Sequence, residues 1–125
     1  MSNIFARNRW LRILTGGVLA EVALLVLAVP LNASDGGRAL LLQIVIPACV
    51  IATFLGGWWV ARKAGGLYWL HGLCVGAIAA LIYGALTWNL VLPDAYILAN
   101  WLKLVGGTAG GLMAQALARG TSSAQ

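Results

Sequence analysis

The sequence predicts an all-α protein, a bundle of four transmembrane helices, and three observations support this. Hydrophobic residues make up 62% of the 125 residues and charged residues only 9%, whereas a soluble domain needs about 25% charged residues to cover its surface. Apolar runs long enough to cross a bilayer follow one another. Basic and aromatic residues gather at the ends of these runs, as they do at membrane interfaces. The expected spans are about 12–31, 39–61, 67–90 and 96–118, within a single integral membrane domain, residues 1–125.

The central turn is the clearest of the predicted interfaces. Residues 56–66 read GGWWVARKAGG, so two cations follow a tryptophan pair and glycines lie on both sides. Aromatic rings at headgroup depth with cations in the water beyond are typical of a cytoplasmic turn. The other two connections, residues 31–38 and 93–95, contain Asp35 and Asp94. We expect them to be polar loops, because exposed backbone and charges are excluded from hydrocarbon.

The distribution of positive charge orients the predicted bundle. The two other loops carry a single cation, Arg38. The termini and the central turn carry all the other interfacial cations, namely Arg7, Arg9, Arg12, Arg62, Lys63 and Arg119. Because Lys and Arg are enriched in cytoplasmic loops, we predict that both termini lie in the cytoplasm.

The two halves of the chain show a weak internal repeat. Thr15-Gly16 aligns with His71-Gly72, and Gly56-Gly57 aligns with Gly110-Gly111. Each half would be one helical hairpin, and both halves would have the same orientation, so a symmetry axis would run along the membrane normal. The alternative is that helices rich in small residues resemble one another without any repeat.

The motifs of several function classes are missing from the sequence. It contains one histidine, three acidic residues and no paired carboxylates, metal-ligand spacing or phosphate loop, so we predict no enzyme activity, no cofactor and no metal. The net charge of +5 is spread over the helix ends and not gathered into a patch, which excludes nucleic acid as a partner. The predicted partner is the lipid bilayer.

Three polar residues are the candidate proton or ion sites, because polar groups inside a membrane are costly and often functional. Glu21 lies about 14 Å along the helix from Arg12, near mid-membrane, where an unpaired carboxylate would be neutral. It is either a proton or cation relay or a hydrogen-bonded or ion-paired structural acid, and we expect the structural role. Lys103 lies about 8 Å higher; the two side chains could meet, but we expect Lys103 to extend to the outer headgroups near Trp101. His71 is expected to form hydrogen bonds at the inner interface.

Small residues predict where the helices pack closely. They recur every fourth residue in the third span and again in the fourth, and such stripes let two helices approach each other. They are Gly72, Gly76, Ala80 and Gly84 in the third span, and Gly106 and Gly110 in the fourth. Because a minimal bundle needs fewer such surfaces, a second copy of the chain or a larger membrane complex is a further predicted partner.

The layout resembles the small, uncharacterised four-span membrane proteins of bacteria, in which a Gly-Gly, aromatic and basic turn precedes a glycine-striped helix. The residues that carry this resemblance run from Gly56 to Gly84 and from Gly106 to Gly111. The resemblance implies a bacterial inner (cytoplasmic) membrane location and no known activity. We therefore expect a non-catalytic packing or interaction subunit of a membrane assembly.

A second resemblance is confined to the first span. Residues 16–22 read GGVLAEV and are similar to the first helix of small multidrug resistance transporters, in which an acidic residue binds protons and cationic drugs. Only Glu21 corresponds to that family. The third span lacks its aromatic pattern, and the loop before Arg38 is long and polar. The resemblance implies the alternative function, a small proton-coupled transporter that uses the Glu21 carboxylate.

Overall fold

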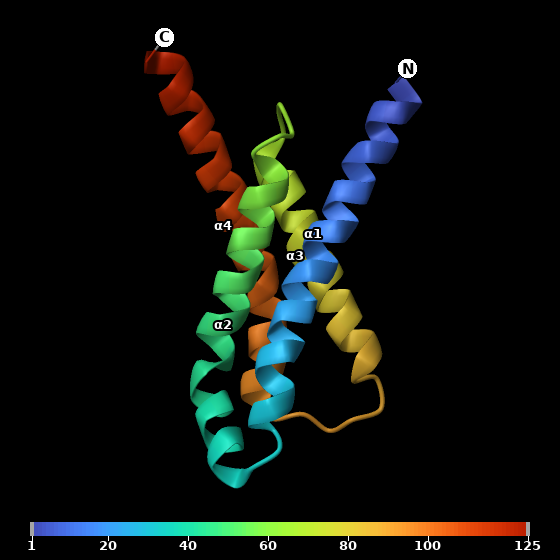
Figure 1. Cartoon of the computed structure of the whole chain (residues 1–125), viewed down its shortest axis with the longest axis vertical. Helices are drawn as coiled ribbons and strands as arrows, with labels where there is room; N and C mark the ends of the chain where they lie inside the picture. Colours follow the sequence, from blue (N-terminus) through green and yellow to red (C-terminus); the bar gives the residue numbers. More distant parts are fainter. Residues whose placement is uncertain (1, 125) are drawn as a thin grey trace.

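The chain folds as a bundle of helices. The computed structural model describes the backbone of residues 2–124 and the side chains of residues 8–120. These residues form four helices and no strand: α1 (Ser2–Leu31), α2 (Asp35–Ala61), α3 (Tyr68–Leu86) and α4 (Asp94–Ala124). The predicted all-α, four-helix fold is confirmed. The start of α1, the end of α4 and the α2–α3 turn lie at one end of the bundle, which we call the terminal end; the α1–α2 and α3–α4 connections form the loop end (Figure 1).

The α1–α2 connection is shorter than the polar loop that the sequence predicts over residues 31–38. Helix α2 begins at Asp35, because the hydroxyl of Ser34 accepts a hydrogen bond from the Gly37 N–H at 3.0 Å and so caps the helix. The Asp35 carboxylate in the first turn also stabilises the start of the helix, because it lies at the positive end of the helix dipole. The polar residues of this segment therefore start a helix.

The α3–α4 connection is longer than predicted. Helix α3 ends at Leu86, short of the expected limit near residue 90. The backbone N–H of Thr87 still donates to the Tyr83 carbonyl at 3.0 Å, and so does the Thr87 hydroxyl, at 2.7 Å. The chain then crosses to α4, which begins at Asp94.

Helices α1 and α4 each pack against α2 and α3. In the described part of the chain, no residue of α1 has its Cα within 8 Å of a Cα of α4. A small apolar core of Ile13, Val60 and Val75 joins α1, α2 and α3. Helices α2 and α3 therefore contact each other and both remaining helices, whereas the backbones of α1 and α4 stay apart.

Glycines allow the close approach of α4 to its two neighbours. A Cβ atom added to Gly72 or Gly76 of α3 would come within 3.0 Å of the α4 backbone. A Cβ on Gly106 or Gly110 of α4 would meet the α2 backbone equally closely. Small residues at such positions let van der Waals contact form between helix backbones, so these glycines fix α4 against α2 and α3.

The predicted stripe on α3 does not extend over its whole length. Ala80 still faces α4, since its carbonyl oxygen accepts a hydrogen bond from Asn100 Nδ2 at 3.3 Å. Gly84, however, has open space around the position of an added Cβ, with nothing within 4 Å. The expectation that Gly84 packs a helix is wrong within this chain, because no other described element lies beside this position of α3.

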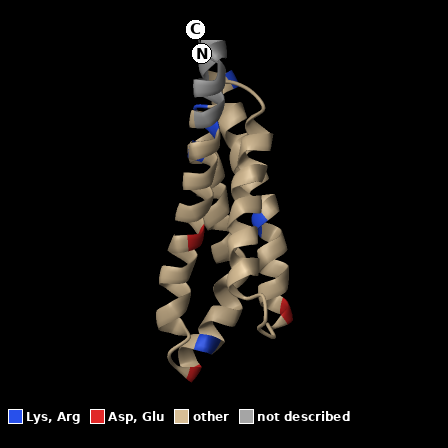
Figure 2. Ribbon diagram, turned by 90° about the vertical axis from the view of Figure 1, so that its right-hand side faces the viewer, with Lys and Arg blue, Asp and Glu red and all other residues tan. Residues whose placement is uncertain are grey.

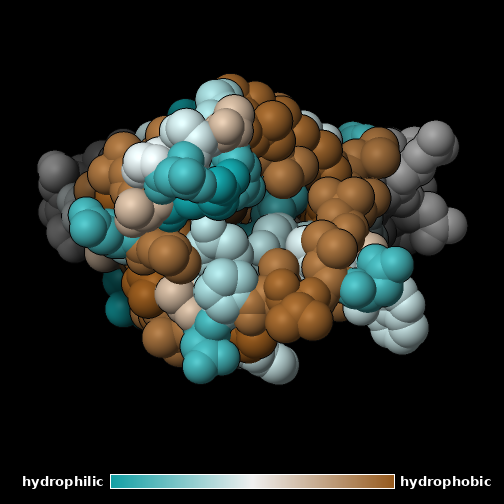
Figure 3. All heavy atoms as spheres, turned by 90° about the horizontal axis from the view of Figure 1, so that it is seen from below, coloured by the Kyte–Doolittle hydropathy of each residue, from teal (hydrophilic) through white to brown (hydrophobic). Residues whose placement is uncertain are grey.

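The surface of the bundle fits a membrane environment. Among the described residues, three helical segments are long and apolar enough to cross a bilayer: Asn8–Leu31, Asp35–Ala61 and Tyr68–Leu86. Large apolar side chains are exposed on all four helices, and seen from the loop end they reach the outer surface between the polar loop residues (Figure 3). Basic residues gather at the terminal end, and Asp35 and Asp94, with which α2 and α4 begin, lie at the loop end (Figure 2).

Candidate functional site

The candidate site is centred on an ion pair in the interior of the bundle. Lys103 Nζ of α4 donates a hydrogen bond to Glu21 Oε2 of α1 at 2.8 Å, and both side chains are only 2% exposed. The expectation that Lys103 extends to the headgroups beside Trp101 is wrong. Trp101 is 67% exposed and lies on another face of α4, whereas Lys103 lies on the inward face that also carries Gly106 and Gly107.

A third side chain holds the lysine in place. The Lys103 ammonium lies 4.5 Å from the centroid of the Tyr83 ring of α3, close enough for a cation–π attraction. The ammonium thus has the Glu21 carboxylate and an aromatic face as partners, from two different helices. This arrangement compensates part of the cost of removing both charges from water.

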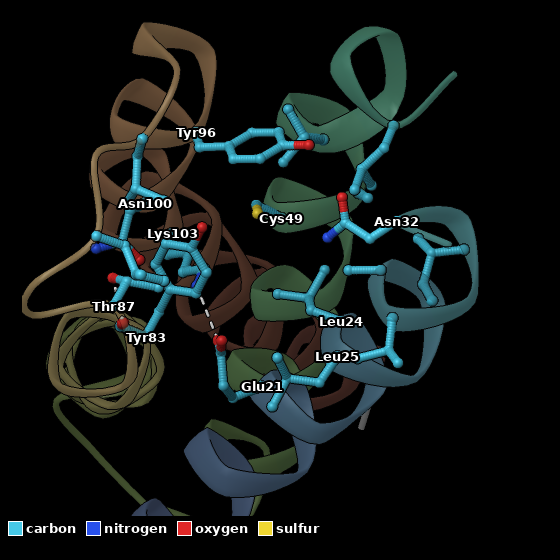
Figure 4. A pocket seen from close by; sticks show the side chains of 18 residues that line it. Glu21, Leu24, Leu25, Asn32, Cys49, Tyr83, Thr87, Tyr96, Asn100 and Lys103 are labelled. Carbon is cyan, nitrogen blue, oxygen red and sulfur yellow. Dashed lines mark hydrogen bonds and ion pairs between the residues drawn. The ribbon is translucent and has the colours of Figure 1, made fainter. Parts of the chain in front are cut away.

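The ion pair lies at the inner end of a cavity of about 240 Å³, which extends to the α1–α2 and α3–α4 connections and which we call the loop-end cavity. Figure 4 shows the labelled side chains around it, and Glu21 of α1 faces Lys103 of α4. Its walls are mostly apolar, with a few polar side chains among them. The lining residues come from all four helices and from the two connections at the loop end. They include Leu24, Leu25 and Ala28 of α1, Asn32 just after it, Leu41, Val45 and Cys49 of α2, Tyr83 of α3, Thr87 of the α3–α4 connection, and Tyr96 and Asn100 of α4.

One polar atom in this wall has no partner. Asn100 lies one turn before Lys103 on α4, and its Nδ2 donates to the Ala80 carbonyl. Its Oδ1 is buried without a hydrogen-bond partner. A buried acceptor of this kind costs free energy unless a donor reaches it, so Asn100 Oδ1 can accept a hydrogen bond from an N–H or O–H group brought beside it.

The third predicted site residue lies elsewhere. His71, near the start of α3, is 5% exposed, and its Nδ1 donates a hydrogen bond to the Leu67 carbonyl at 2.8 Å. It lines a different cavity, at the terminal end of the bundle. The chain therefore brings Glu21 and Lys103 together and keeps His71 apart from them.

Sequence reasoning did not find Tyr83 and Asn100. Asn100 could have been found, because it precedes Lys103 by one helical turn and therefore shares its face. Tyr83 lies on another helix, and no spacing in the sequence relates it to Lys103. Its role depends on how α3 packs against α4.

The arrangement offers an ion pair, an unpaired amide oxygen and apolar walls as binding groups. In the part of the chain that the structure describes, no three His, Cys, Asp or Glu side chains gather where they could hold a metal ion. An apolar cavity with a few convergent polar groups is the usual form of a small-molecule site. No protein-family model, curated protein or solved structure matches this chain, so the site is interpreted from its own chemistry and both sequence resemblances stay predictions.

Proposed function

We propose that this chain is a non-catalytic integral membrane protein of a bacterial inner membrane that binds an amphiphilic molecule in the loop-end cavity. In this proposal all four helices cross the bilayer, and both termini lie on the cytoplasmic side. The charge distribution supports the orientation, since Arg9, Arg12, Arg62 and Lys63 all belong to the terminal end and cations favour the cytoplasmic side.

Helix α4 is less apolar than the three membrane-length segments, because it contains several glycines and Lys103. Two features support its place in the bilayer. Its glycines hold it against α2 and α3, and its outward side chains, among them Leu98, Trp101, Val105 and Leu112, are large, apolar and exposed. The charge of Lys103 is buried and paired, so it does not oppose contact with lipid.

The observation that carries the binding proposal is the position of the Glu21–Lys103 pair at the end of the loop-end cavity. A pair that only joins two helices would be expected in close packing on all sides. Here a cavity of about 240 Å³ adjoins it, lined mainly by apolar side chains. The site therefore offers an apolar chamber for the body of a ligand and a polar inner end for its head.

The polar groups indicate the chemistry of the head. Asn100 Oδ1 requires a donor, and the Glu21 carboxylate, which accepts one hydrogen bond from Lys103, can accept further ones. An alkyl chain with a primary ammonium head satisfies both, because the ammonium carries three N–H donors. Such a ligand would share the Glu21 carboxylate with Lys103.

The proposed role is non-catalytic, as the sequence predicts, but it is the binding of a ligand and not the packing of helices against a partner. The sequence predicts a second copy of the chain or a larger membrane complex as a partner for the glycine stripes. The contacts of Gly72, Gly76, Gly106 and Gly110 are made within the chain, so these glycines give no support to an outside partner. The loop-end cavity, by contrast, is a space that the side chains of this chain do not fill.

The proposal is tested by ligand-dependent stability of the purified protein in a neutral detergent. We expect decylammonium to raise the melting temperature, and decanoate, whose head has no donor for Asn100, to raise it less. Ala28 lines the cavity, so Ala28→Leu should fill it and abolish the effect. Ala23→Leu is the matched control, because Ala23 is exposed on the same helix. Equal stabilisation of the two variants would place the ligand outside the cavity and contradict the proposal.

Proton-coupled transport is the second candidate function, and one observation favours it. Glu21 is a mid-helix carboxylate at the inner end of a cavity, as a proton-exchanging site requires. Transport would need the carboxylate to separate from Lys103 during the cycle. Proton release from the purified protein on adding tetraphenylphosphonium near neutral pH, lost in Glu21→Gln, would favour transport. No release from either protein, with both folded, would leave binding as the function.

A further inference from the structure

A second cavity lies at the terminal end of the bundle, far along the helices from the Glu21–Lys103 pair. Its volume is about 200 Å³, and we call it the basic cavity. Three elements form its walls: the start of α1, the α2–α3 turn with the end of α2, and the start of α3. The side chains that line it include Asn8, Arg9, Arg12, Val60, Lys63 and His71.

The basic cavity concentrates positive charge without a counter-ion. Arg9, Arg12 and Lys63 line it, and no Asp or Glu is among the lining residues. The ion pairs found among the described residues join Arg38 to Asp35 and Lys103 to Glu21, so neither neutralises these three cations. Like charges held together in this way repel one another, and an anion between them would remove that repulsion.

Arg12 is held in a fixed position within this cluster. Its Nη2 donates a hydrogen bond to the Trp59 carbonyl at 3.0 Å, and its guanidinium lies 4.9 Å from the centroid of the Trp59 ring. Stacking on an aromatic face and one backbone hydrogen bond leave further N–H groups of the guanidinium free to bind. Arg12 is therefore oriented before any ligand arrives, which lowers the entropy cost of binding.

His71 adds a buried polar atom that lacks a partner. The ring donates through Nδ1 to the Leu67 carbonyl, which leaves Nε2 as the other functional atom. Nε2 is buried without a hydrogen-bond partner, although the side chain belongs to the wall of the basic cavity. A neutral imidazole accepts a hydrogen bond at this atom, and an imidazolium donates one there. Both states call for a polar partner at this atom, beside the basic cavity.

From these four groups we infer that the basic cavity binds a phosphate group. Guanidinium groups bind phosphate oxygens through paired hydrogen bonds, and lysine adds a point charge. A phosphate that carries a hydroxyl can also donate to His71 Nε2 when it reaches that atom. The cavity is several times larger than the ~30 Å³ that one water molecule occupies in the liquid, so a tetrahedral anion has room to enter.

Two sources of this phosphate chemistry are open to the protein. Basic pockets between membrane helices bind the headgroups of anionic lipids, and a soluble phosphate could enter from the water beyond the turn. The inference is independent of the proposed function, because it concerns another cavity and other residues. It also holds whichever leaflet the terminal end faces.

The test is a binding titration of the full chain, purified in a neutral detergent and followed by native mass spectrometry. The probes are dioleoyl phosphatidylglycerol, dioleoyl phosphatidylcholine and inorganic phosphate. We expect Lys63→Gln to weaken phosphate-group binding about tenfold, the loss that follows from one hydrogen bond to a charged group. Arg62→Gln is the matched control: Arg62 is the neighbouring residue, equally exposed, but it lies over the Trp58 ring and not in the cavity.

Each outcome decides the inference. Binding of phosphatidylglycerol above phosphatidylcholine, weakened by Lys63→Gln alone, identifies a lipid headgroup as the source. Binding of inorganic phosphate with the same mutational pattern identifies a soluble anion. Equal loss in Lys63→Gln and Arg62→Gln would mean general attraction to a basic surface and would overturn the inference, as would no binding of any probe. Both substitutions lie in an exposed turn, so folding is expected to survive in each.

A second measurement reports on the site directly. His71 is the only histidine in the sequence, so a tag-free protein with nitrogen-15-labelled histidine gives the signals of one ring. We expect the bound probe to shift the Nε2 signal and to leave the Nδ1 signal, which belongs to the bond with Leu67, nearly unchanged. Neither signal moving at a concentration that saturates binding would remove His71 from the site.

Discussion

Glu21 and Lys103 join two helices whose backbones do not meet. Their side chains lie 2.8 Å apart, although no Cα of α1 comes within 8 Å of a Cα of α4 in the described residues. Direct packing fixes α1 to α2 and α3, and α4 to the same two helices. The ion pair therefore spans the gap that the loop-end cavity occupies, and it couples the wall formed by α1 to the wall formed by α4.

The first prediction concerns the strength of this pair. Removing one partner of a buried ion pair leaves an uncompensated group, which costs about 3–5 kcal/mol, whereas replacing both by apolar residues is often neutral. We expect Glu21→Met and Lys103→Met each to lower the free energy of unfolding strongly, and the double variant to recover most of the loss. Thermal unfolding in detergent, followed by circular dichroism, measures the cycle.

A surface pair provides the control for that cycle. Asp35 and Arg38 form an exposed ion pair at the loop end, and exposed pairs contribute about 0–1 kcal/mol. Asp35→Asn should therefore change stability little. Additive effects of Glu21→Met and Lys103→Met would show that the two residues act independently, and would contradict the coupling.

The second prediction compares Gly76 and Gly84 of α3, which belong to the same four-residue repeat in the sequence. A Cβ on Gly76 would come within 3.0 Å of the α4 backbone, whereas one on Gly84 would meet nothing within 4 Å. Gly76→Ala should therefore separate two helices and destabilise the protein by about 1–3 kcal/mol, as overpacking does. Gly84→Ala should be neutral or stabilising, because alanine favours a helix over glycine by roughly 0.5–1 kcal/mol. Equal melting temperatures for the two variants would contradict this assignment of the contacts.

The third prediction separates the ring of Tyr83 from its hydroxyl. Lys103 contacts the face of the ring, so Tyr83→Phe should keep the cation–π attraction. Tyr83→Leu should lose it, at a cost of about 0.5–2 kcal/mol. The comparison of both variants with the wild type by thermal unfolding tests this. A loss from Tyr83→Phe as large as that from Tyr83→Leu would show that the hydroxyl is the group that matters.

The fourth prediction concerns access to the loop-end cavity. Cys49 is buried and lines that cavity, so in a Cys74→Ala background a small, charged thiol reagent added from the loop side should reach it slowly. Ala28→Leu, which fills the cavity, should slow the reaction further. Ala23→Leu should leave the rate unchanged, since Ala23 lies on the exposed face of α1. A rate that is the same in all three proteins would mean that the reagent reaches Cys49 by another path.

The fifth prediction concerns topology. If α4 crosses the bilayer, the α2–α3 turn and the end of the chain lie on the same side, and both loops of the loop end lie on the other. Reporter fusions at Asp35 and Asp94 should report the outside, and fusions at Ala64 and after Gln125 the cytoplasm. An outside signal after Gln125 with a cytoplasmic signal at Ala64 would mean that α4 does not cross. A mixed signal at Ala64 would contradict a single orientation.

The helical architecture follows from the amino-acid sequence. Its apolar runs predict the helices that form the bundle, because each run is long enough to satisfy its own backbone hydrogen bonds, and three of the described helical segments are long and apolar enough to cross a membrane. The close contacts of Gly72 and Gly76 also follow from local spacing, since residues four apart share one face of a helix. The internal repeat, the inner-membrane location and the orientation stay predictions.

Which side chains meet depends on how the helices pack against one another. Spacing along α4 could not tell whether Lys103 extends to the headgroups or turns inward, because both are within reach of its long side chain; the packing of α4 against α2 and α3 turned its face toward Glu21. The same packing placed Tyr83 on the ammonium and separated His71 from the pair. Gly84 shares the spacing of Gly76 and yet packs on nothing. A periodic pattern defines a face of one helix, but the crossing of two helices determines how much of that face is in contact.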